Sequence, residues 1–577
     1  MKKIFSCLFL GALILSSCED FLDKTPLDQI TDQNYWKTTS DLELYVNQYY
    51  TQFPGFTIGS QNAGIFSIDN NSDNMIPAAF NTTLGGVSTL PSSGGGWSWT
   101  NIRSVNVFLD NYKNVASPLE DYNTYVGEAM FFKAYFYFNL LKTFGDVPWY
   151  AKPLQTNSEG LFDPRTPRHV VADSILSLLD NAITRLKVSD DVIPFRINKE
   201  VALLFKSRVA LFEGTWEKYH AGTAFGAAEN KANVFLQQAV DAASELINMG
   251  TVGIYSTGNP AKDYVNLFNA ADYAGISEVM LWKKFDRNLA MGHSVYLTTY
   301  NGHGTGLSKE LVESYLATDG LPISLSGVYN GDANYITETV NRDPRLIQTI
   351  FMPGDEVTVR DGNVVRSFEK PDLAESSFFI NTTGYQIEKG HRPVKYTDAD
   401  FNDSDNASII FRYAEVLLNY AEAKAELGTV TQEDLDMSVN KLRDRVSMPH
   451  MNLTDISSWN DPDWDFPTLT PAINEIRRER RVELASEGFR FDDLRRWKAH
   501  HLVVGVRPLG AKFSPSDYPE LEVGKDIFIN GDGYIDPYQK SLPSGWGFDP
   551  NRDYLSPIPT NELTLNSNLA QNPGWQL

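Results

Sequence analysis

Cysteine is almost absent from this chain of 577 residues, which has only Cys7 and Cys18. Cys7 lies in an apolar N-terminal run that we expect to be removed, so Cys18 is left alone. A single cysteine cannot form an internal disulfide, and the folded chain must therefore be held together by burial of apolar surface. A chain of this length buries a large enough share of its surface to do so.

Positive charge is also scarce. The 50 Lys and Arg side chains face 73 Asp and Glu, and the formal net charge is −23. This balance repels phosphate backbones and argues against nucleic acid as a ligand. It is compatible with a neutral or cationic ligand.

The usual catalytic motifs are missing. The sequence has no G-x-S-x-G nucleophile elbow, no H-E-x-x-H pair and no Walker pattern, and its eight His are scattered. A glycosidase needs only two carboxylates, and 73 acidic residues do not single out a pair. We predict a binding protein rather than an enzyme, with a hydrolase and a helical-repeat adaptor as the weaker alternatives.

The longest apolar stretch is at the N-terminus and is too short for a membrane-spanning helix. Lys2 and Lys3 precede the apolar residues 4–15, and Ser16, Ser17 and Cys18 follow. This order is that of a secretory signal, whereas a spanning helix needs about 20 residues. The end of the run, Leu15 to Cys18, resembles a bacterial lipobox. We therefore expect residues 1–17 to be a signal peptide and Cys18 to be the acylated, palmitate-bearing N-terminus. The alternative is an ordinary signal peptide with Cys18 incidental.

Several segments have the apolar period of a helix, with proper ends. Thr166 and Asn198 are the predicted N-caps of two of them. Gly145 and Gly250 follow the ends of two others. The predicted helices cover residues 128–144, 165–186, 198–216, 235–246, 412–427 and 473–497. Their recurrence in pairs suggests a layout similar to tetratricopeptide repeats, although no fixed period is present.

Three long stretches are rich in Gly, Asn, Asp, Ser or Pro: residues 56–100, 250–410 and 500–577. Such loops are long for a compact domain, and long ordered loops commonly carry function. Aromatic residues make up 12% of the chain. Many must be core, but a protein that stacks on sugar rings would also show this excess.

Five blocks in order resemble the SusD/RagB family of outer-membrane nutrient-binding lipoproteins. The first, Phe21 to Pro26 with Tyr35 to Thr38, directly follows Cys18. The other four are Phe131 to Pro148, Arg412 to Gly428, Ile473 to Trp497 and Tyr554 to Trp575.

The resemblance implies a mainly α fold. Four tetratricopeptide-like helix pairs would form a right-handed scaffold, with long irregular loops and a few short strands carrying the ligand face. Residues 18–577 would form one body, with an N-terminal region over about 18–220 and a C-terminal region over about 270–577.

The resemblance also implies a location and a partner. The protein would be lipid-anchored in the outer membrane, facing the cell exterior, with the lipid as its only membrane contact. Glu19 and Asp20 fit the export signal of surface lipoproteins in this family. It would capture a glycan for a SusC-like, TonB-dependent barrel transporter. An oligopeptide, as in the RagB branch, is the alternative ligand.

Sugars bind by stacking on aromatic rings while short polar side chains contact their hydroxyls. Two loop segments offer that combination, and family members build their ligand face from loops in these regions. The candidate ligand-binding residues are Asp73, Asn74, Trp97, Trp99, Tyr296, Tyr300 and His303. Trp99 stands at the start of a predicted helix and is also a candidate for the core.

Acidic residues elsewhere have structural interpretations. Glu479 and Glu483 lie one turn apart in an arginine-rich helix, which favours an ion-pair network over acid/base chemistry. We predict Glu415 and Glu422 as partners of those arginines. Residues 530–536 and the group Asp398, Asp400, Asp403 and Asp405 could bind Ca²⁺, but neither has the spacing of a known Ca²⁺ loop. We interpret both as solvated acidic turns and predict no cofactor.

Overall fold

The computed structural model describes residues 35–57, 64–192, 194–374, 380–395 and 404–575. The predicted signal peptide, the lipidation of Cys18 and the block at Phe21 to Pro26 lie outside these residues, as do Asp398, Asp400 and Asp403. Within the described part, no helix is both long enough and apolar enough to cross a membrane.

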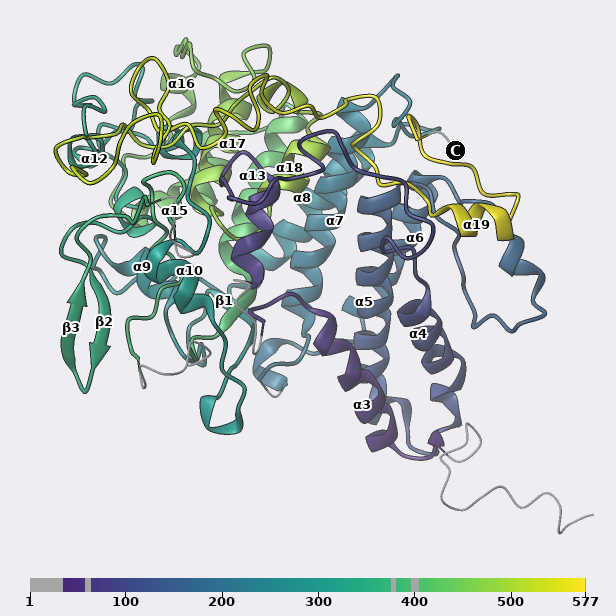
Figure 1. Cartoon of the computed structure of the whole chain (residues 1–577). Helices are drawn as coiled ribbons and strands as arrows, with labels where there is room; N and C mark the ends of the chain where they lie inside the picture. The colour runs from purple at the N-terminus through teal and green to yellow at the C-terminus, as the bar shows by residue number, and fades with distance from the viewer. Residues whose placement is uncertain (1–34, 58–63, 193, 375–379, 396–403, 576–577) are drawn as a thin grey trace, which may run out of the picture.

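The fold is mainly helical, as the sequence predicts (Figure 1). Its scaffold consists of α3 (Thr39–Asn47), α4 (Thr100–Asn111), α5 (Leu119–Phe144), α6 (Arg168–Ile183), α7 (Lys199–Tyr219), α8 (Ala232–Met249), α13 (Tyr413–Glu426), α17 (Pro471–Glu483) and α18 (Arg490–Arg496).

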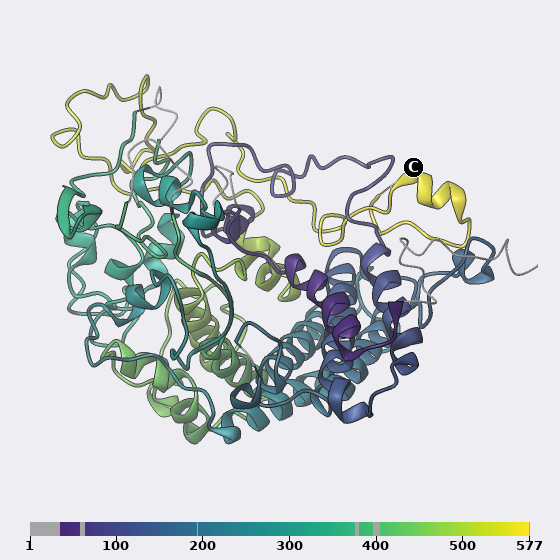
Figure 2. The same ribbon diagram turned by 90° about the horizontal axis from the view of Figure 1, so that it is seen from below.

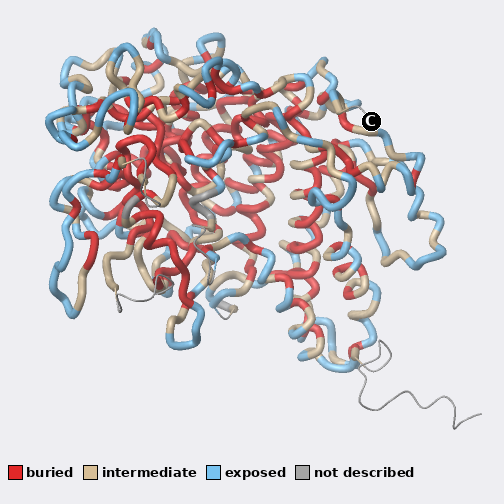
Figure 3. Tube along the Cα trace, in the orientation of Figure 1, coloured by how far each residue is buried: buried red, intermediate tan, exposed pale blue. Residues whose placement is uncertain are grey.

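These helices pack in successive pairs, in the manner of tetratricopeptide repeats. Helix α5 packs on α6, α7 packs on α8, and α13 packs on α7, α8 and α17. Seen from below, the helices form a curved row along one side of the molecule, and irregular segments cover the other side (Figure 2). The largest apolar core lies between the helices, and the exposed chain is mostly loop (Figure 3).

Helix α5 lies at the centre because its sequence is apolar on nearly every side. Phe131, Phe132, Leu141 and Phe144 are fully buried. It ends at Gly145, whose φ of 73° is strained for any side chain that carries a Cβ. The helix starts at Leu119, a few turns before the predicted start at residue 128, because an exposed and more polar first part extends the apolar segment.

One of the two predicted N-caps is confirmed. The Asn198 side chain accepts a hydrogen bond from the Val201 amide at 2.9 Å. The prediction for Thr166 is wrong, because Thr166 pairs with Val147 through two backbone hydrogen bonds in an isolated bridge. Helix α6 starts two residues later, and Asp146 caps it from outside by accepting from the Arg168 amide at 2.8 Å.

The single helix predicted over residues 473–497 is wrong, because the chain breaks it into α17 and α18. Ser486 and Gly488 adopt φ values of 62° and 82°, which no right-handed helix contains. Asp69, from a distant loop, accepts a hydrogen bond from the Ser486 amide at 2.8 Å. A tertiary contact therefore stabilises the break.

The remaining elements are short. They are α9 (Asp263–Phe268), α10 (Val295–Asn301), α11 (Lys309–Ser314), α12 (Tyr335–Thr339), α14 (Gln432–Met437), α15 (Val439–Arg445), α16 (Leu453–Ile456) and α19 (Thr560–Leu565), with the strands β1 (Val279–Lys283), β2 (Glu356–Arg360), β3 (Asn363–Ser367) and β4 (Ser408–Arg412). Strand β1 pairs antiparallel with β4, and β2 pairs antiparallel with β3. The two small sheets position loops around the helical scaffold.

Candidate functional site

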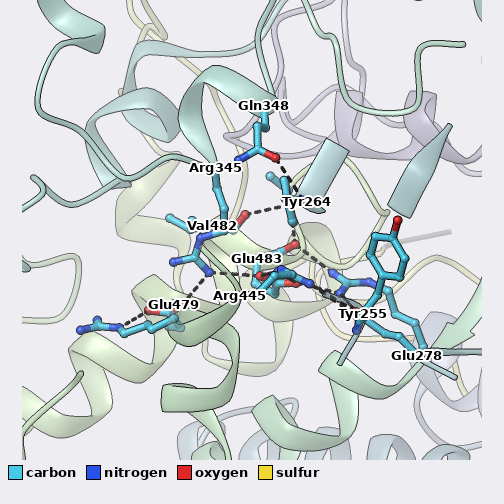
Figure 4. Close-up of polar contacts among 12 residues, drawn as sticks. Tyr255, Tyr264, Glu278, Arg345, Gln348, Arg445, Glu479, Val482 and Glu483 are labelled. Carbon is cyan, nitrogen blue, oxygen red and sulfur yellow. Dashed lines mark hydrogen bonds and ion pairs between the residues drawn. The ribbon is translucent and has the colours of Figure 1, made fainter. Parts of the chain in front are cut away.

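The arginine-rich helix α17 carries a buried ion-pair network (Figure 4). Glu483 contacts three guanidinium groups: Arg445 at 2.6 Å, Arg412 at 2.8 Å and Arg345 at 3.0 Å. Glu479 pairs with Arg345 at 2.6 Å and with Arg443 at 2.9 Å. The prediction that these two carboxylates belong to an ion-pair network is confirmed.

Of the two predictions that pair Glu415 and Glu422 with arginines of α17, the one for Glu422 is confirmed and the one for Glu415 is not. Glu422 lies 3.8 Å from Arg480 of α17, and it pairs more closely with Arg496 of α18 at 2.5 Å. The prediction for Glu415 is wrong, because it pairs with Arg208 of α7 at 2.6 Å. Helix α13 packs against both α7 and α17, and Glu415 pairs with the former.

The electrostatics of the network suit structure rather than proton transfer. Burial alone would raise the pKa of Glu483, but Arg445, Arg412 and Arg345 hold that pKa well below its usual range. A carboxylate that stays ionised cannot act as a general acid near neutral pH.

Asp73 and Asn74 belong to the same kind of contact. Arg490 donates two hydrogen bonds to the Asp73 carboxylate, each at 2.7 Å, and Arg481 donates to Asn74 Oδ1 at 2.9 Å. Burial would raise the pKa of Asp73, but Arg481 and Arg490 lower it to about 2. Asn74 thus contacts α17 and Asp73 contacts α17 and α18, and these contacts join a loop to the scaffold.

Tyr296 and Tyr300 lie together in α10. Their rings stack with centroids 5.1 Å apart, and Arg366 of β3 lies 3.9 Å from the Tyr300 ring centroid. The Tyr296 hydroxyl is hydrogen-bonded to the Thr358 hydroxyl at 2.5 Å, and its ring is buried. Tyr300 is only half-buried, so of the two it is the ring that a ligand can reach.

Trp97 and Trp99 form a second aromatic group at the start of α4. Their ring centroids lie 4.7 Å apart, and Trp97 packs on Phe144 at 5.0 Å. Trp97 is buried, whereas Trp99 is half-buried and lies against Tyr150. His303 is half-buried in the loop between α10 and α11, with a φ of 42°. The predicted ligand residues therefore occupy separate places, and their role in binding stays a prediction.

The two acidic segments form internal contacts. Asn530 Oδ1 accepts from the Asp532 and Tyr534 amides, and Asp536 pairs with Arg507 at 2.9 Å. Asp405 pairs with Arg392 at 3.1 Å. Among the described residues, no three His, Cys, Asp or Glu side chains are grouped closely enough to hold a metal ion.

The sequence does not reveal a cleft of about 390 Å³ between α5, α7, α13 and the turn that joins α17 to α18. This volume is in the range of small-molecule sites, about 300–1,000 Å³. Aromatic and amide side chains line it. Tyr135, Asn139, Phe489 and Phe491 are half-buried and so reachable, and Gln52, from the short segment before Phe53, is exposed. We call it the central cleft.

Charged side chains in the wall of the central cleft are paired with one another. Lys142 and Asp492 are 2.6 Å apart, and Arg208 and Glu415 are also 2.6 Å apart. Arg412 lies 2.7 Å from Glu487. Ser408 Oγ is buried in the same wall and has no hydrogen-bond partner. Aromatic faces beside neutralised charges suit an uncharged polar ligand.

The available sequence signal for the central cleft is weak. Phe489 and Phe491 flank Arg490 just after Gly488, inside a block whose arginines and glutamates indicate a scaffold. The break at residues 486–488 brings these two rings to the same cleft as α5 and α7, which lie far earlier in the chain. The prediction of one unbroken helix over this stretch therefore gave no indication that Phe489 and Phe491 line a cleft.

Comparisons with known proteins agree with this architecture. Residues 250–575 match the model described as SusD family, and residues 20–211 match one described as starch-binding associating with outer membrane. SusD-like protein P2 of Formosa agariphila is 24% identical, and the alignment covers 100% of both chains. A SusD-like carbohydrate binding protein of Bacteroides fragilis superposes with a TM-score of 0.71 at 22% identity, over 93% of this chain and 100% of its own. A laminarin binding SusD-like protein superposes with a TM-score of 0.56 at 20% identity, over 94% of this chain and 100% of its own.

Proposed function

The chain belongs to the SusD family, and from this premise we propose that it captures a glycan at the cell surface and does not act on it chemically. The observation that carries the proposal is the central cleft, whose wall combines aromatic rings, amide groups and paired charges. Pyranose rings have apolar C–H faces for the rings and hydroxyl edges for the amides. A neutral sugar also leaves the ion pairs of the wall intact.

A binding screen tests the proposal. The mature protein is titrated by calorimetry with neutral glycans and with oligopeptides, and each mixture is assayed for new reducing ends. We expect at least one glycan to bind, no peptide to bind, and no reducing ends to form. Peptide binding without glycan binding would replace the proposal by the oligopeptide alternative, and release of sugar would make the protein an enzyme.

Substitution in the central cleft should locate the site. We expect Phe489→Ala and Phe491→Ala each to weaken glycan binding by about tenfold or more, since an aromatic anchor typically contributes about 2 kcal/mol. Phe162→Ala is the matched control, because that ring is 56% exposed and lies outside the cleft. Trp99→Ala and Tyr300→Ala are measured beside them. If only these two lose binding, the ligand lies on the predicted loop face instead.

We further propose that the protein is anchored to the outer membrane through acylated Cys18 and delivers its glycan to a TonB-dependent barrel. The match to a model described as associating with outer membrane supports the location. We expect Cys18→Ala to release the protein from the membrane fraction, because two acyl chains are what stable anchoring requires. The fractionation is done in cells that lack the transporter, and unchanged membrane association there would refute the lipid anchor.

A further inference from the structure

A second, smaller pocket of about 240 Å³ is lined by other residues of α17 than the central cleft. It is bounded by α11, by the segment 461–466 and by α17. Its wall includes Glu310, Asp463, Trp464 and Asp465. We call it the Trp464 pocket.

The cations in the wall of the Trp464 pocket already have partners. Arg478 pairs with Asp461 at 2.5 Å, and Arg481 pairs with Asp73 at 3.2 Å. Arg477 pairs with Glu426 at 2.9 Å and lies 4.3 Å from the ring centroids of both Phe466 and Trp497. Each of these guanidinium groups thus has an acidic partner, although Nε and Nη1 of Arg477 are buried without a hydrogen-bond partner.

The acidic side chains in the wall of the Trp464 pocket outnumber its guanidinium groups. Glu310 Oε2 is buried and has no hydrogen-bond partner. The Asp463 side chain is exposed at the rim, and Asp465 lies 3.4 Å from Arg490 and 3.7 Å from Arg481, longer than the ion pairs around it. A buried carboxylate oxygen without a hydrogen-bond donor costs free energy. A ligand that donates a hydrogen bond to this oxygen removes that cost and gains affinity.

The pocket also has an aromatic side. Trp464 is half-buried, and its indole N–H donates to Glu475 at 2.8 Å, which fixes the orientation of the ring. An inorganic cation is a poor fit, because no group of three or more ligating side chains is found in the described part of the chain. An ammonium group on a larger ring fits better, since the ammonium meets the carboxylates while the ring contacts Trp464.

We propose that the Trp464 pocket binds a sugar residue that carries a primary ammonium group, with the ammonium donating to Glu310 and the C–H face of the ring on Trp464. The inference rests on the proposed function as a glycan-binding protein and adds to the central cleft a second subsite, which favours glycans that contain a free amino sugar. It also assigns a binding role to Glu310.

Proton linkage gives the proposal a distinct signature. Burial, helped by Glu313 and Asp73 and opposed by Arg481, raises the pKa of Glu310 to about 7. The other charged groups facing the pocket are Arg477 and Arg478 of α17 and the aspartates 461, 463 and 465. An ammonium ligand favours the ionised carboxyl, so its affinity should rise about tenfold between pH 5.0 and pH 6.5 as the ionised fraction grows.

Three tetramers with the same β-1,4 linkage separate the possible ligands: those of glucosamine, N-acetylglucosamine and glucose. Calorimetry on the full mature protein should show about tenfold tighter binding of the glucosamine tetramer than of either neutral one. Glu310→Gln should abolish both this preference and its rise with pH, without lowering the melting temperature. Glu120→Gln, an exposed site on α5, should change neither.

Any other outcome of these titrations overturns the inference, and each outcome points to a different reason. Equal binding of the three tetramers, or a preference that survives in Glu310→Gln, excludes the ammonium site. Tetralysine binding as tightly as the glucosamine tetramer, and lost in Glu310→Gln, would assign the pocket to peptide amines instead. If neutral glycans bind while the amine preference is absent, only this inference fails. If no glycan binds, the proposed function fails with it.

Discussion

Glu483→Gln is expected to lower the free energy of unfolding by about 3–5 kcal/mol. The carboxylate of Glu483 is fully buried and touches three guanidinium groups, of Arg345, Arg412 and Arg445. The amide keeps the shape of the side chain but removes its negative charge. Three buried guanidinium groups then lose part of the negative charge that offsets the free-energy cost of burying them.

The measurement is urea unfolding followed by circular dichroism, with Glu245→Gln as the matched control. Glu245 pairs with Lys199 at 2.8 Å, but its side chain is 48% exposed. Exposed pairs contribute about 0–1 kcal/mol, so the control should unfold close to the wild type. Equal unfolding midpoints for the two variants would contradict the structural role of the network.

Glu388→Gln is expected to stabilise the protein at alkaline pH and to leave its stability unchanged at pH 4. Burial, helped by Asp355 and opposed by Lys262, raises the pKa of Glu388 to about 8. Its Oε2 atom is buried and has no hydrogen-bond partner. The folded state therefore holds a proton that the unfolded state has released.

The sign of the pH dependence follows from that difference. A carboxyl whose pKa is raised by folding contributes its full stability below the unfolded pKa of 4.5, and this contribution is lost as the pH rises through about 8. The amide cannot lose a proton, so Glu388→Gln should exceed the wild type by about 2–4 kcal/mol at pH 9.

Unfolding midpoints at pH 4, 7 and 9 check this prediction. The control is Glu120→Gln, which changes an exposed carboxyl and should follow the wild type at each pH. Glu217, whose pKa burial and the neighbouring Glu213 raise to about 8, keeps part of the alkaline loss in every variant. A constant difference between Glu388→Gln and the wild type at all three pH values would refute the assignment.

Local features of the chain could be predicted from sequence because they depend on neighbours within a few residues. The apolar residues 128–144 suffice to predict the central helix α5, and Asn198 caps α7 three residues ahead of its hydrogen-bond partner. The density of Arg and Glu in 475–483 likewise indicates an ion-pair network, but the partners of Glu479 and Glu483 are arginines of other segments, at positions 345, 412, 443 and 445. The family blocks combine such local signals in one order.

The candidate site was harder to predict from the sequence than the helices were. Aromatic and polar residues in loops indicate a sugar-binding surface, but the pattern does not tell a ring in the core from a ring at the surface. Trp97 and Tyr296 are buried, whereas Trp99 and Tyr300 next to them are half-buried. Exposure is decided by which distant segments pack on each ring, and no local pattern in the sequence predicts this.

The amino-acid sequence by itself determined the helical class, the main helices and the family, because periodicity and capping act over a turn or two of the chain. Tertiary structure decided the rest. It placed Arg208 beside Glu415, a partner 207 positions away, and Asp69 beside Ser486, 417 positions away. It also brought Phe489 and α5 into the wall of the central cleft, and Glu310 and Trp464 into the wall of the second pocket. Contacts of such separation depend on how the helices pack against one another, which no local pattern encodes.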